Sequence, residues 1–483
     1  MSESGDVDGE RELPAGWVWV ELGDLLDRIE AGKSFTCEPR RALPEEWGVI
    51  KVSAMTWGAF DPDENKAVPA GRDFNPDYEI SSGDLLVSRA NTKAYVGAPV
   101  LVGTCRPRLL LSDKSLRLVP HGSVSKRWLL HFLRSPKSRA YVEAKASGTK
   151  DAMRNLSQEA LRRMPVALPP LAEQRRIVEA LEEQLSRIDS GVSTLLASRK
   201  RLEGLRKRVL VSAIPDKLPE SWRMTTVEDA GTLELGRARH PDWHRGPEMR
   251  PYLRVANVFE DRIDTSDVME MDFSGVWEKY RLKSGDVLLN EGQSPHLVGR
   301  PALYRGVPDG VAFTNSLIRF QAGDDVLPEW ALIVFRRHLH AKRFMREVRI
   351  TTNIAHLSAK RLKNVEFPVP PLAVQKRIVQ RCDELLSGIA AMDQQVETGL
   401  RRARTLKSAL LRRAFTGGLV PQDSDEEPAA PLVARIAAER AAQPRAKRTR
   451  KTTAKPPAQR VADATAPEPT AAPALAVQQE FEL

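Results

Sequence analysis

Two long stretches of this chain place apolar residues alternately three and four positions apart. A spacing of 3.5 residues over several heptads is typical of helices that pack as a coiled coil. No proline occurs between Ala172 and Ser212, and Pro215 follows the first stretch. The apolar series consists of Ile177, Leu181, Ile188, Leu195, Leu202 and Leu205, and in the second stretch of Ile378, Leu385, Ile389, Val396, Leu406 and Leu410. The pattern predicts two long helices, at 169–214 and 370–416, that pack against each other.

Small residues within the two series favour an antiparallel pairing. In a parallel, in-register pair, Ser198 would face Gly399 and leave one layer nearly empty. In a two-fold antiparallel register, Gly399 faces Ile188 and Gly191 faces Val396. A small residue then meets a large one, which limits destabilising cavities. We therefore expect an antiparallel coiled coil roughly 60 Å long, at about 1.5 Å per residue.

The two helical stretches begin within an internal repeat. Residues 165–189 read PVALPPLAEQRRIVEALEEQLSRID, and residues 366–389 read EFPVPPLAVQKRIVQRCDELLSGI. Residues 82–101 (SGDLLVSRANTKAYVGAPVL) return in a similar form as residues 284–303 (SGDVLLNEGQSPHLVGRPAL). A repeat of this length indicates duplication, and duplicated units commonly pack about a pseudo-two-fold axis.

Each half of the chain shows strand signals before its long helix. A Ser-Gly-Asp turn leads into an apolar strand in both halves, and Pro-Pro-Leu precedes both helices. We predict an α+β protein with two mixed α/β globular domains, separated by two long helices and related by a pseudo-two-fold repeat. The predicted boundaries are 1–168 for the first domain, 169–214 for the first helix, 215–369 for the second domain, 370–416 for the second helix and 417–483 for a tail. The tail is rich in Ala, Pro and charged residues, a composition that predicts disorder.

Net charge and cysteine usage narrow the classes of function. The chain of 483 residues has a formal net charge of +10, with 41% hydrophobic and 29% charged residues. A basic body favours an acidic partner such as nucleic acid, although charge alone is equally compatible with a basic soluble protein. Three widely spaced cysteines indicate neither a disulfide framework nor a zinc site. Since no membrane-span or signal-peptide pattern occurs, we expect a cytoplasmic protein.

Several segments approach a catalytic motif without completing it. Residues 32–34 (Gly-Lys-Ser) resemble the end of a phosphate-binding loop, but Asp27 stands where that loop requires glycine. Residues 75–78 (Asn-Pro-Asp-Tyr) differ from the Asn-Pro-Pro-Tyr loop of adenine methyltransferases, and no glycine-rich loop for a methyl donor precedes them. The histidine pairs at 240/244 and 338/340 lack further ligands at zinc spacing. We expect no catalytic centre and no metal site in this chain.

The repeated motifs carry a family resemblance. Residues 169–174 (PPLAEQ) and 370–375 (PPLAVQ), each following a variable globular region and opening a long helix, resemble the specificity subunit of type I restriction–modification systems. The resemblance covers residues 13–416, and therefore both halves. One departure is Val374, which occupies the position of Glu173 in the first copy.

The resemblance implies a role in DNA recognition. Each globular region would be a target recognition domain that reads one half of a bipartite, asymmetric site in double-stranded DNA. The antiparallel coiled coil would set the length of the unread spacer and bind two methyltransferase (modification) subunits, which use S-adenosylmethionine to methylate adenine N6. Restriction/motor subunits using ATP and Mg²⁺ would complete the complex. The chain itself would be non-catalytic and hold no cofactor. A coiled-coil scaffold that binds protein, or a specificity subunit of a methylation-only complex, are the alternatives.

Polar and forked side chains in the loops are the candidates for DNA contact, because such groups read base edges and phosphates. The candidates in the first domain are Lys33, Ser34, Arg89, Asn91, Lys93, Tyr95, Lys145, Lys150 and Arg154, and those in the second are Arg237, Arg239, Asn290, Glu291, Gln293, Ser294, His296, Arg349, Thr351, Thr352, Asn353 and His356. The loops differ in sequence between the two domains, which favours two different half-sites.

Overall fold

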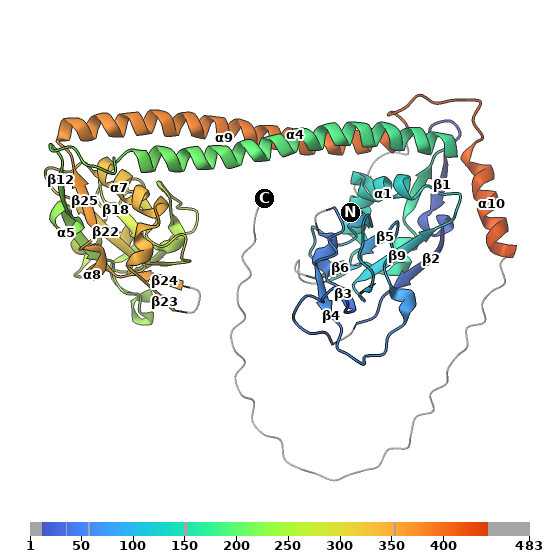
Figure 1. Ribbon diagram of the computed structural model, residues 1–483, viewed down its shortest axis with the longest axis horizontal. Helices are drawn as coiled ribbons and strands as arrows, with labels where there is room; N and C mark the ends of the chain where they lie inside the picture. The colour runs from blue at the N-terminus through green and yellow to red at the C-terminus, as the bar shows by residue number, and fades with distance from the viewer. Residues whose placement is uncertain (1–11, 35, 57, 149–152, 352–353, 443–483) are drawn as a thin grey trace, which may run out of the picture.

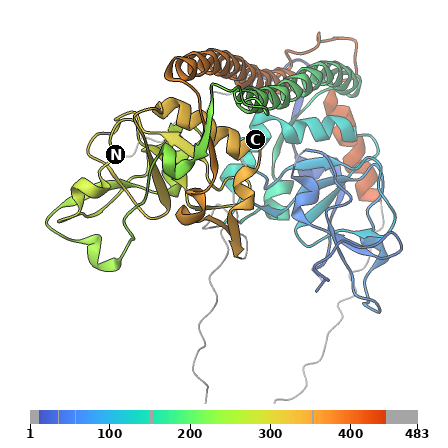
Figure 2. The ribbon, with the colours of Figure 1, turned by 60° about the vertical axis from the view of Figure 1, so that its left-hand side comes forward.

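Two mixed α/β domains lie beneath opposite ends of one pair of long helices (Figure 1). The computed structural model describes residues 12–34, 36–56, 58–148, 153–351 and 354–442. Figure 2 shows the same arrangement turned by 60°, with both domains on the same side of the helix pair. The predicted α+β class, with two mixed domains and a long paired-helix linker, is confirmed.

The first domain is built on a four-stranded antiparallel sheet in the order β2-β9-β5-β7. Its strands are β2 (Leu26–Ala31), β9 (Ser115–Pro120), β5 (Leu85–Ser88) and β7 (Pro99–Leu101). Three smaller pairings complete the domain: β1 (Val18–Glu21) with β11 (Pro165–Leu168), β4 (Asn65–Ala67) with β3 (Gly48–Ile50) and β8 (Leu109–Leu110), and β6 (Ala90–Asn91) with β10 (Arg154–Asn155). Its helices are α1 (Lys126–Arg134), α2 (Pro136–Lys145) and α3 (Gln158–Arg162), with a short 3-10 turn, η1, at Leu22–Leu25.

The second domain repeats this plan. Its four-stranded sheet has the order β13-β22-β18-β20, formed by β13 (Gly231–Leu235), β22 (Leu317–Ala322), β18 (Val287–Asn290) and β20 (Pro301–Leu303). The smaller pairings join β12 (Arg223–Thr226) with β25 (Glu366–Val369), β17 (Met269–Asp272) with β14 (Met249–Leu253) and β21 (Ala312–Phe313), β15 (Val258–Phe259) with β16 (Arg262–Ile263), and β19 (Gly292–Gln293) with β24 (Ile354–Leu357) and β23 (Val348–Thr351). Its helices are α5 (Val227–Ala230), α6 (Trp277–Tyr280), α7 (Pro328–His340) and α8 (Ala359–Leu362).

The duplication read from the sequence is therefore a duplication of fold. A fully buried tryptophan stands at the equivalent place in each core, Trp128 on α1 and Trp330 on α7. Each belongs to a different hydrophobic cluster, so the two domains have separate hydrophobic cores. Burying an aromatic side chain of this size is among the larger contributions that a single residue makes to the stability of a domain.

The long helices are α4 (Leu171–Ser212) and α9 (Leu372–Ala414). Both begin directly after a Pro-Pro pair, which is tolerated at a helix start because the first turn has no intrahelical N–H partner. Arg199 of α4 lies 3.1 Å from Glu397, while Asp189, ten residues earlier, pairs with Lys407. Residue numbers rise along one helix as they fall along the other, so the predicted antiparallel pairing is confirmed.

The register, however, differs from the prediction by one heptad. A Cβ added at Gly399 would lie 3.0 Å from a methyl carbon of Leu195, not against the expected Ile188, and a Cβ at Gly191 would meet nothing within 4 Å. A heptad pattern is equally satisfied by registers seven residues apart, so apolar spacing alone does not select one. The ion pairs at Arg199 and Lys407 distinguish the registers.

The predicted apolar seam is only partly covered. Ile177 and Leu181 are buried where α4 meets the first domain, and Ile389 and Val396 are buried against α4. Other predicted members of the seam stay exposed, namely Leu205 (38%), Leu385 (39%) and Leu406 (55%). Two helices alone enclose only one narrow stripe of each other, so the expectation that all twelve positions form the contact is wrong for these three.

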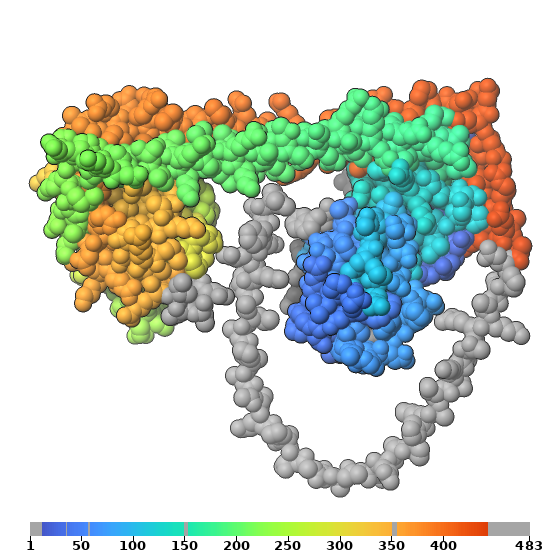
Figure 3. Space-filling view, viewed as in Figure 1, coloured from blue at the N-terminus to red at the C-terminus, as the bar shows by residue number. Residues whose placement is uncertain are grey.

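Each domain packs against both helices. The core of the first domain includes Ile177 near the start of α4 and Ala414 at the end of α9. The core of the second domain includes Cys382 near the start of α9 and Ile214 just after α4. The space-filling view shows one domain under each end of the helix pair (Figure 3). This double attachment sets the distance between the domains.

The C-terminal segment corrects the prediction of a disordered tail from residue 417. Residues 415–428 form a strap over the start of α4, and α10 (Ala429–Ala442) then packs on η1 of the first domain. Leu432 (2% exposed) and Ile436 (1%) enter the core. The Ala-rich composition conceals this short amphipathic series, whose burial outweighs the cost of ordering the segment. Residues 443–483 lie outside the described residues.

Candidate nucleic-acid interface

In both domains, short strands bring together two loops that carry DNA-contact candidates. In the first domain, β6 pairs with β10, so the segment 89–95 meets residues 153–155, and Ser147 bridges to Asn155. In the second, β19 pairs with β24, and β24 with β23, so the segment 290–296 meets residues 354–357, with 348–351 beside them. In Figure 1, β6 and β23–β24 lie away from the helix pair, on the parts of the two domains that face each other. The two candidate surfaces are therefore equivalent in position.

The predicted residues Lys33 and Ser34 belong to the same surface of the first domain. They follow β2, and both are exposed. A Cβ at Gly32 would lie 2.0 Å from the Leu111 carbonyl oxygen, so glycine lets this segment pass close to residues 111–112. The next residues of that neighbouring segment contact the 89–91 loop, since the Arg89 N–H donates to the Lys114 carbonyl over 2.8 Å.

Three candidates make contacts within their own domains, and the burial of two of them, Asn91 and Asn290, corrects their assignment as DNA contacts, while Arg237 is half-buried. Asn91 is buried, and its amide donates to Ser88 Oγ over 3.2 Å. Asn290 is fully buried. Arg237 lies 4.1 Å from the ring centre of Trp243 and donates to a backbone carbonyl. Polar side chains adjacent to loops have to satisfy the loop backbone, and the sequence pattern does not separate that role from base contact.

The remaining candidates fall into three groups. Exposed side chains are Lys33, Ser34, Lys93, Lys145, Arg239, His296, Arg349 and His356, and half-buried ones are Arg89, Tyr95, Arg154, Glu291, Gln293 and Ser294. Lys150, Thr352 and Asn353 lie outside the described residues, and Thr351 is placed in β23 by its backbone. The structure thus brings most of the candidates of each domain to one surface, while their contact with DNA stays a prediction.

Two residues that the sequence reasoning missed also belong to the first surface. Lys114 is exposed beside Arg89. Arg139 on α2 donates to the Val96 carbonyl over 2.6 Å and to the Ala94 carbonyl over 3.4 Å, behind the loop that carries Lys93. Burial lowers the pKa of Arg139. No local pattern links Arg139 to a loop that lies some forty residues earlier, so only the folded chain reveals this support.

The start of α4 is a buried polar junction. Glu173 is 1% exposed and accepts hydrogen bonds from Trp17 Nε1 (2.9 Å) and from Gln422 of the strap (2.7 Å). Burial raises the pKa of Glu173, while these hydrogen bonds oppose the shift. Arg176 also pairs with Glu426 of the strap. The N-terminal segment, the first long helix and the strap are therefore tied at one carboxylate.

The start of α9 is arranged differently, with Val374 in the position of Glu173. Gln375 is fully buried and accepts from the Leu327 N–H (2.9 Å), while its amide donates to the carbonyls of Asp325 (2.7 Å) and Pro370 (2.8 Å). This glutamine ties the helix start to the loop before α7. The Glu-to-Val departure therefore falls where no strap requires a carboxylate.

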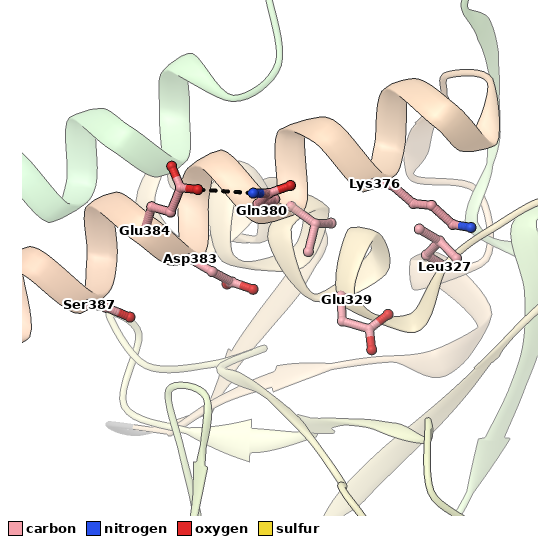
Figure 4. Close-up of a pocket in the computed structure, with 8 residues that line it drawn as sticks. Leu327, Glu329, Lys376, Gln380, Asp383, Glu384 and Ser387 are labelled. Carbon is pink, nitrogen blue, oxygen red and sulfur yellow. Dashed lines mark hydrogen bonds between the residues drawn. The ribbon is translucent and has the colours of Figure 1, made fainter.

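An open groove lies beside the start of α9 (Figure 4). Its volume is about 760 Å³, and Glu329 of α7 and Asp383 of α9 line it together with Lys376. Burial, with the nearby carboxylates of Asp261 and Glu329, raises the pKa of Asp383. At the equivalent place in the first domain, Arg127 and Glu182 form an ion pair of 3.1 Å. Glu329 stands in the second domain where Arg127 stands in the first. The groove is therefore lined by two carboxylates, those of Glu329 and Asp383.

Within the described ranges, no group of three or more His, Cys, Asp or Glu side chains is arranged to hold a metal ion. Among the histidine pairs, His338 is buried and lies 3.0 Å from the Glu366 carbonyl oxygen, and His340 lies 3.0 Å from Glu260. Burial lowers the pKa of His338 to about 4. No helix in the part of the chain that the structure describes is both long and apolar enough to cross a membrane.

Comparison with known proteins identifies the fold and the family. The family model described as "Type I restriction modification DNA specificity domain" matches residues 14–192 and again residues 219–398. The EcoKI specificity subunit of Escherichia coli K12 is 25% identical over 91% of this chain and 99% of that protein. The EcoAI specificity subunit of Escherichia coli is 30% identical over 86% of this chain and 85% of that protein.

Two further matches differ in extent. The EcoEI specificity subunit of Escherichia coli is 35% identical over 39% of this chain, and the match spans only 32% of that protein. A solved structure from work on complex assembly and conformational transition of a type I R-M system aligns with a TM-score of 0.65. Its identity is 21%, and the alignment covers 84% of this chain and 100% of that one, so it shows a shared fold.

Proposed function

The chain belongs to the type I restriction–modification DNA specificity family, and from this premise we propose that it directs partner subunits to one bipartite, asymmetric DNA sequence. Each domain reads one half-site in double-stranded DNA. Partner subunits then methylate adenine N6 within that sequence or cut DNA in an ATP-dependent reaction. The chain selects the DNA sequence and is itself non-catalytic.

One observation carries this proposal: two domains of equivalent fold hold loops of different sequence at opposite ends of a rigid spacer. Long helices of about 40 residues, at about 1.5 Å per residue, span roughly 60 Å. Duplex DNA repeats at about 34 Å per turn, so the span suits two half-sites nearly two turns apart. Equivalent folds with different loops suit a target whose two halves differ.

We further propose that two methyltransferase subunits bind along the helix pair. The exposed apolar residues Leu196 (45%), Met392 (53%) and Leu406 (55%) support this role, since such side chains on a helical rod are typical of protein interfaces. S-adenosylmethionine, ATP and Mg²⁺ are then cofactors of the partner subunits. A complex with methyltransferase subunits alone performs modification, and addition of the motor and nuclease subunits adds restriction.

Methylation mapping tests the proposal. The chain is expressed with its methyltransferase partner in a host that lacks adenine-N6 methylation, and modified positions are read across the genome. We expect one bipartite motif with an unread spacer. Replacing residues 1–168 by the corresponding domain of another family member is expected to change one half-site only. A genome without a bipartite motif, or a change in both halves, contradicts the proposal.

A further inference from the structure

The backbone of Arg89 makes hydrogen bonds to neighbouring segments of the first domain on both sides. Its N–H donates to the Lys114 carbonyl over 2.8 Å, and its carbonyl accepts from the Leu156 N–H over 2.9 Å. It lies between β5 and β6, next to the exposed loop that carries Lys93. These two hydrogen bonds fix the backbone of this half-buried residue, while its guanidinium has no side-chain partner among the described residues.

Glu291 occupies the equivalent position in the second domain. Its N–H donates to the Ser316 carbonyl over 2.9 Å, and its carbonyl accepts from the Leu357 N–H over 2.7 Å. It lies between β18 and β19. The two domains therefore use the same pair of backbone hydrogen bonds to present one residue, and the side chain changes from a cation to an anion.

The environment of Glu291 leaves part of its carboxylate available. His356 Nδ1 lies 3.2 Å from Glu291 Oε2, and the other oxygen makes no hydrogen bond within the described residues. The carboxylate is 25% exposed, and the imidazole is 45% exposed. His356 therefore holds the carboxylate through Oε2 and leaves Oε1 without a hydrogen bond among the described residues.

The two side chains have opposite hydrogen-bonding chemistry. An arginine carries donors only and pairs in a bidentate manner with the O6 and N7 acceptors of guanine. An ionised glutamate carries acceptors only and suits the N4 amino group of cytosine. A carboxylate is repelled by the phosphate backbone, so it is tolerated at a DNA surface where a base donor compensates it.

We propose that this one scaffold position reads a base in each half-site, guanine through Arg89 and cytosine through Glu291, with His356 as the positioning residue for Glu291. The inference rests on the proposed role in DNA recognition and specifies which residues carry it. The duplicated scaffold thereby produces an asymmetric target, because one substitution inverts the donor and acceptor roles at a shared position.

Variants of the full chain, expressed with the methyltransferase partner, test this inference by methylation mapping. In the Arg89→Ala variant we expect one guanine of the first half-site to become degenerate, with discrimination falling about tenfold to a hundredfold at that base pair. The second half-site stays unchanged and serves as an internal control for folding and assembly. Glu291→Ala is expected to give the reverse result at one cytosine.

Conservative variants sharpen the assignment. Arg89→Lys keeps a cationic donor and is expected to retain guanine. Glu291→Gln is expected to shift the preference from cytosine towards adenine, because a carboxamide pairs with adenine N6 and N7. Arg163→Ala is the matched control, since this arginine is 68% exposed on the surface of the first domain and pairs with Glu159. The methylated DNA motif of the Arg163→Ala variant is expected to equal that of the wild type.

Three outcomes overturn the inference: an unchanged motif in both alanine variants, a change in the half-site of the other domain, or loss of a base other than guanine or cytosine at these positions. If an alanine variant fails to fold, the base retained by Arg89→Lys and the shift in Glu291→Gln decide the question. A wild-type complex without any bipartite motif overturns the proposed function as a whole. A wild-type motif that Arg89 and Glu291 do not influence overturns this inference alone.

Discussion

The starts of the two long helices have nearly the same sequence and are stabilised in different ways. The first, PPLAEQ, is covered by the strap 415–428 and centres on the buried carboxylate of Glu173. The second, PPLAVQ, has an open groove beside it and depends on the buried amide of Gln375. Duplication produced two similar helix starts, but the strap 415–428 has a counterpart at neither end of the repeat. It therefore closes only the first junction. We therefore expect equivalent substitutions at the two helix starts to change stability by different amounts.

The largest expected effect is on the docking of α10. Replacing Leu432 and Ile436 together by alanine removes two fully buried side chains, each worth about 2–5 kcal/mol in such sites. We expect α10 and the strap to lose protection from hydrogen exchange, while the second domain keeps its protection. Val307→Ala, at a position that is 79% exposed, is the control. Equal loss of protection in both domains argues against a strap that acts on one junction.

A second comparison uses the glutamine common to both motifs. Gln375→Ala breaks hydrogen bonds to Leu327, Asp325 and Pro370, whereas Gln174 has one such bond, from its amide to the Pro169 carbonyl over 3.0 Å. At about 1 kcal/mol for each bond, we expect Gln375→Ala to lower the free energy of unfolding by roughly 2 kcal/mol more than Gln174→Ala. Urea unfolding measures both values. A larger effect for Gln174→Ala contradicts the expected order.

The pH dependence of stability separates the two junctions further. Because burial raises the pKa of Glu173 above its usual value of 4.5, the folded state binds this proton more tightly than the unfolded chain does. The associated stability is present below the usual pKa and is lost as the pH rises through the folded pKa. We expect the free energy of unfolding of the wild type to fall, relative to Glu173→Gln, as the pH rises from 4 to neutrality. A constant difference between the two proteins contradicts a raised pKa.

The smallest effect concerns the groove beside α9. Glu329→Arg places a cation opposite Asp383, as Arg127 stands opposite Glu182 in the first domain. A partly exposed ion pair contributes about 0.2–1 kcal/mol, so we expect a gain of that size in the second domain. Arg127→Ala is expected to lose a similar amount in the first. Thermal unfolding at low and high salt checks both, since screening weakens the effect; a gain independent of salt contradicts an electrostatic cause.

Much of the fold was predictable because its signals are local. The heptad spacing around Leu195 and Ile389 predicted the two helices, and the small residue Gly399 predicted that they run antiparallel. The register was predicted one heptad away, since periodicity repeats itself every seven residues. The order of residues 417–442 was missed because Leu432 and Ile436 gain their stability from a domain near the other end of the chain.

The same distinction between local signals and distant contacts applies to the candidate DNA-contact residues. The sequence placed Arg89 and Glu291 in polar loops at equivalent points of the repeat, and the structure brings them to equivalent surfaces. It also predicted outward positions for Asn91 and Asn290, which are buried inside their domains. Whether a polar side chain faces solvent or a buried carbonyl depends on neighbours far along the chain, which composition does not reveal.

By itself, the sequence determined the duplication, the two long helices, the antiparallel direction and the family, because these depend on spacing, composition and repeated motifs. The tertiary structure decided the register of the coiled coil, the closure of the first junction by the strap and the burial of two polar candidates. It also showed that Arg89 and Glu291 occupy one scaffold position. Each of these depends on contacts between residues distant in sequence, such as Glu173 with Gln422 or Arg199 with Glu397. Local pattern specifies elements, and the packing of distant residues specifies how they meet.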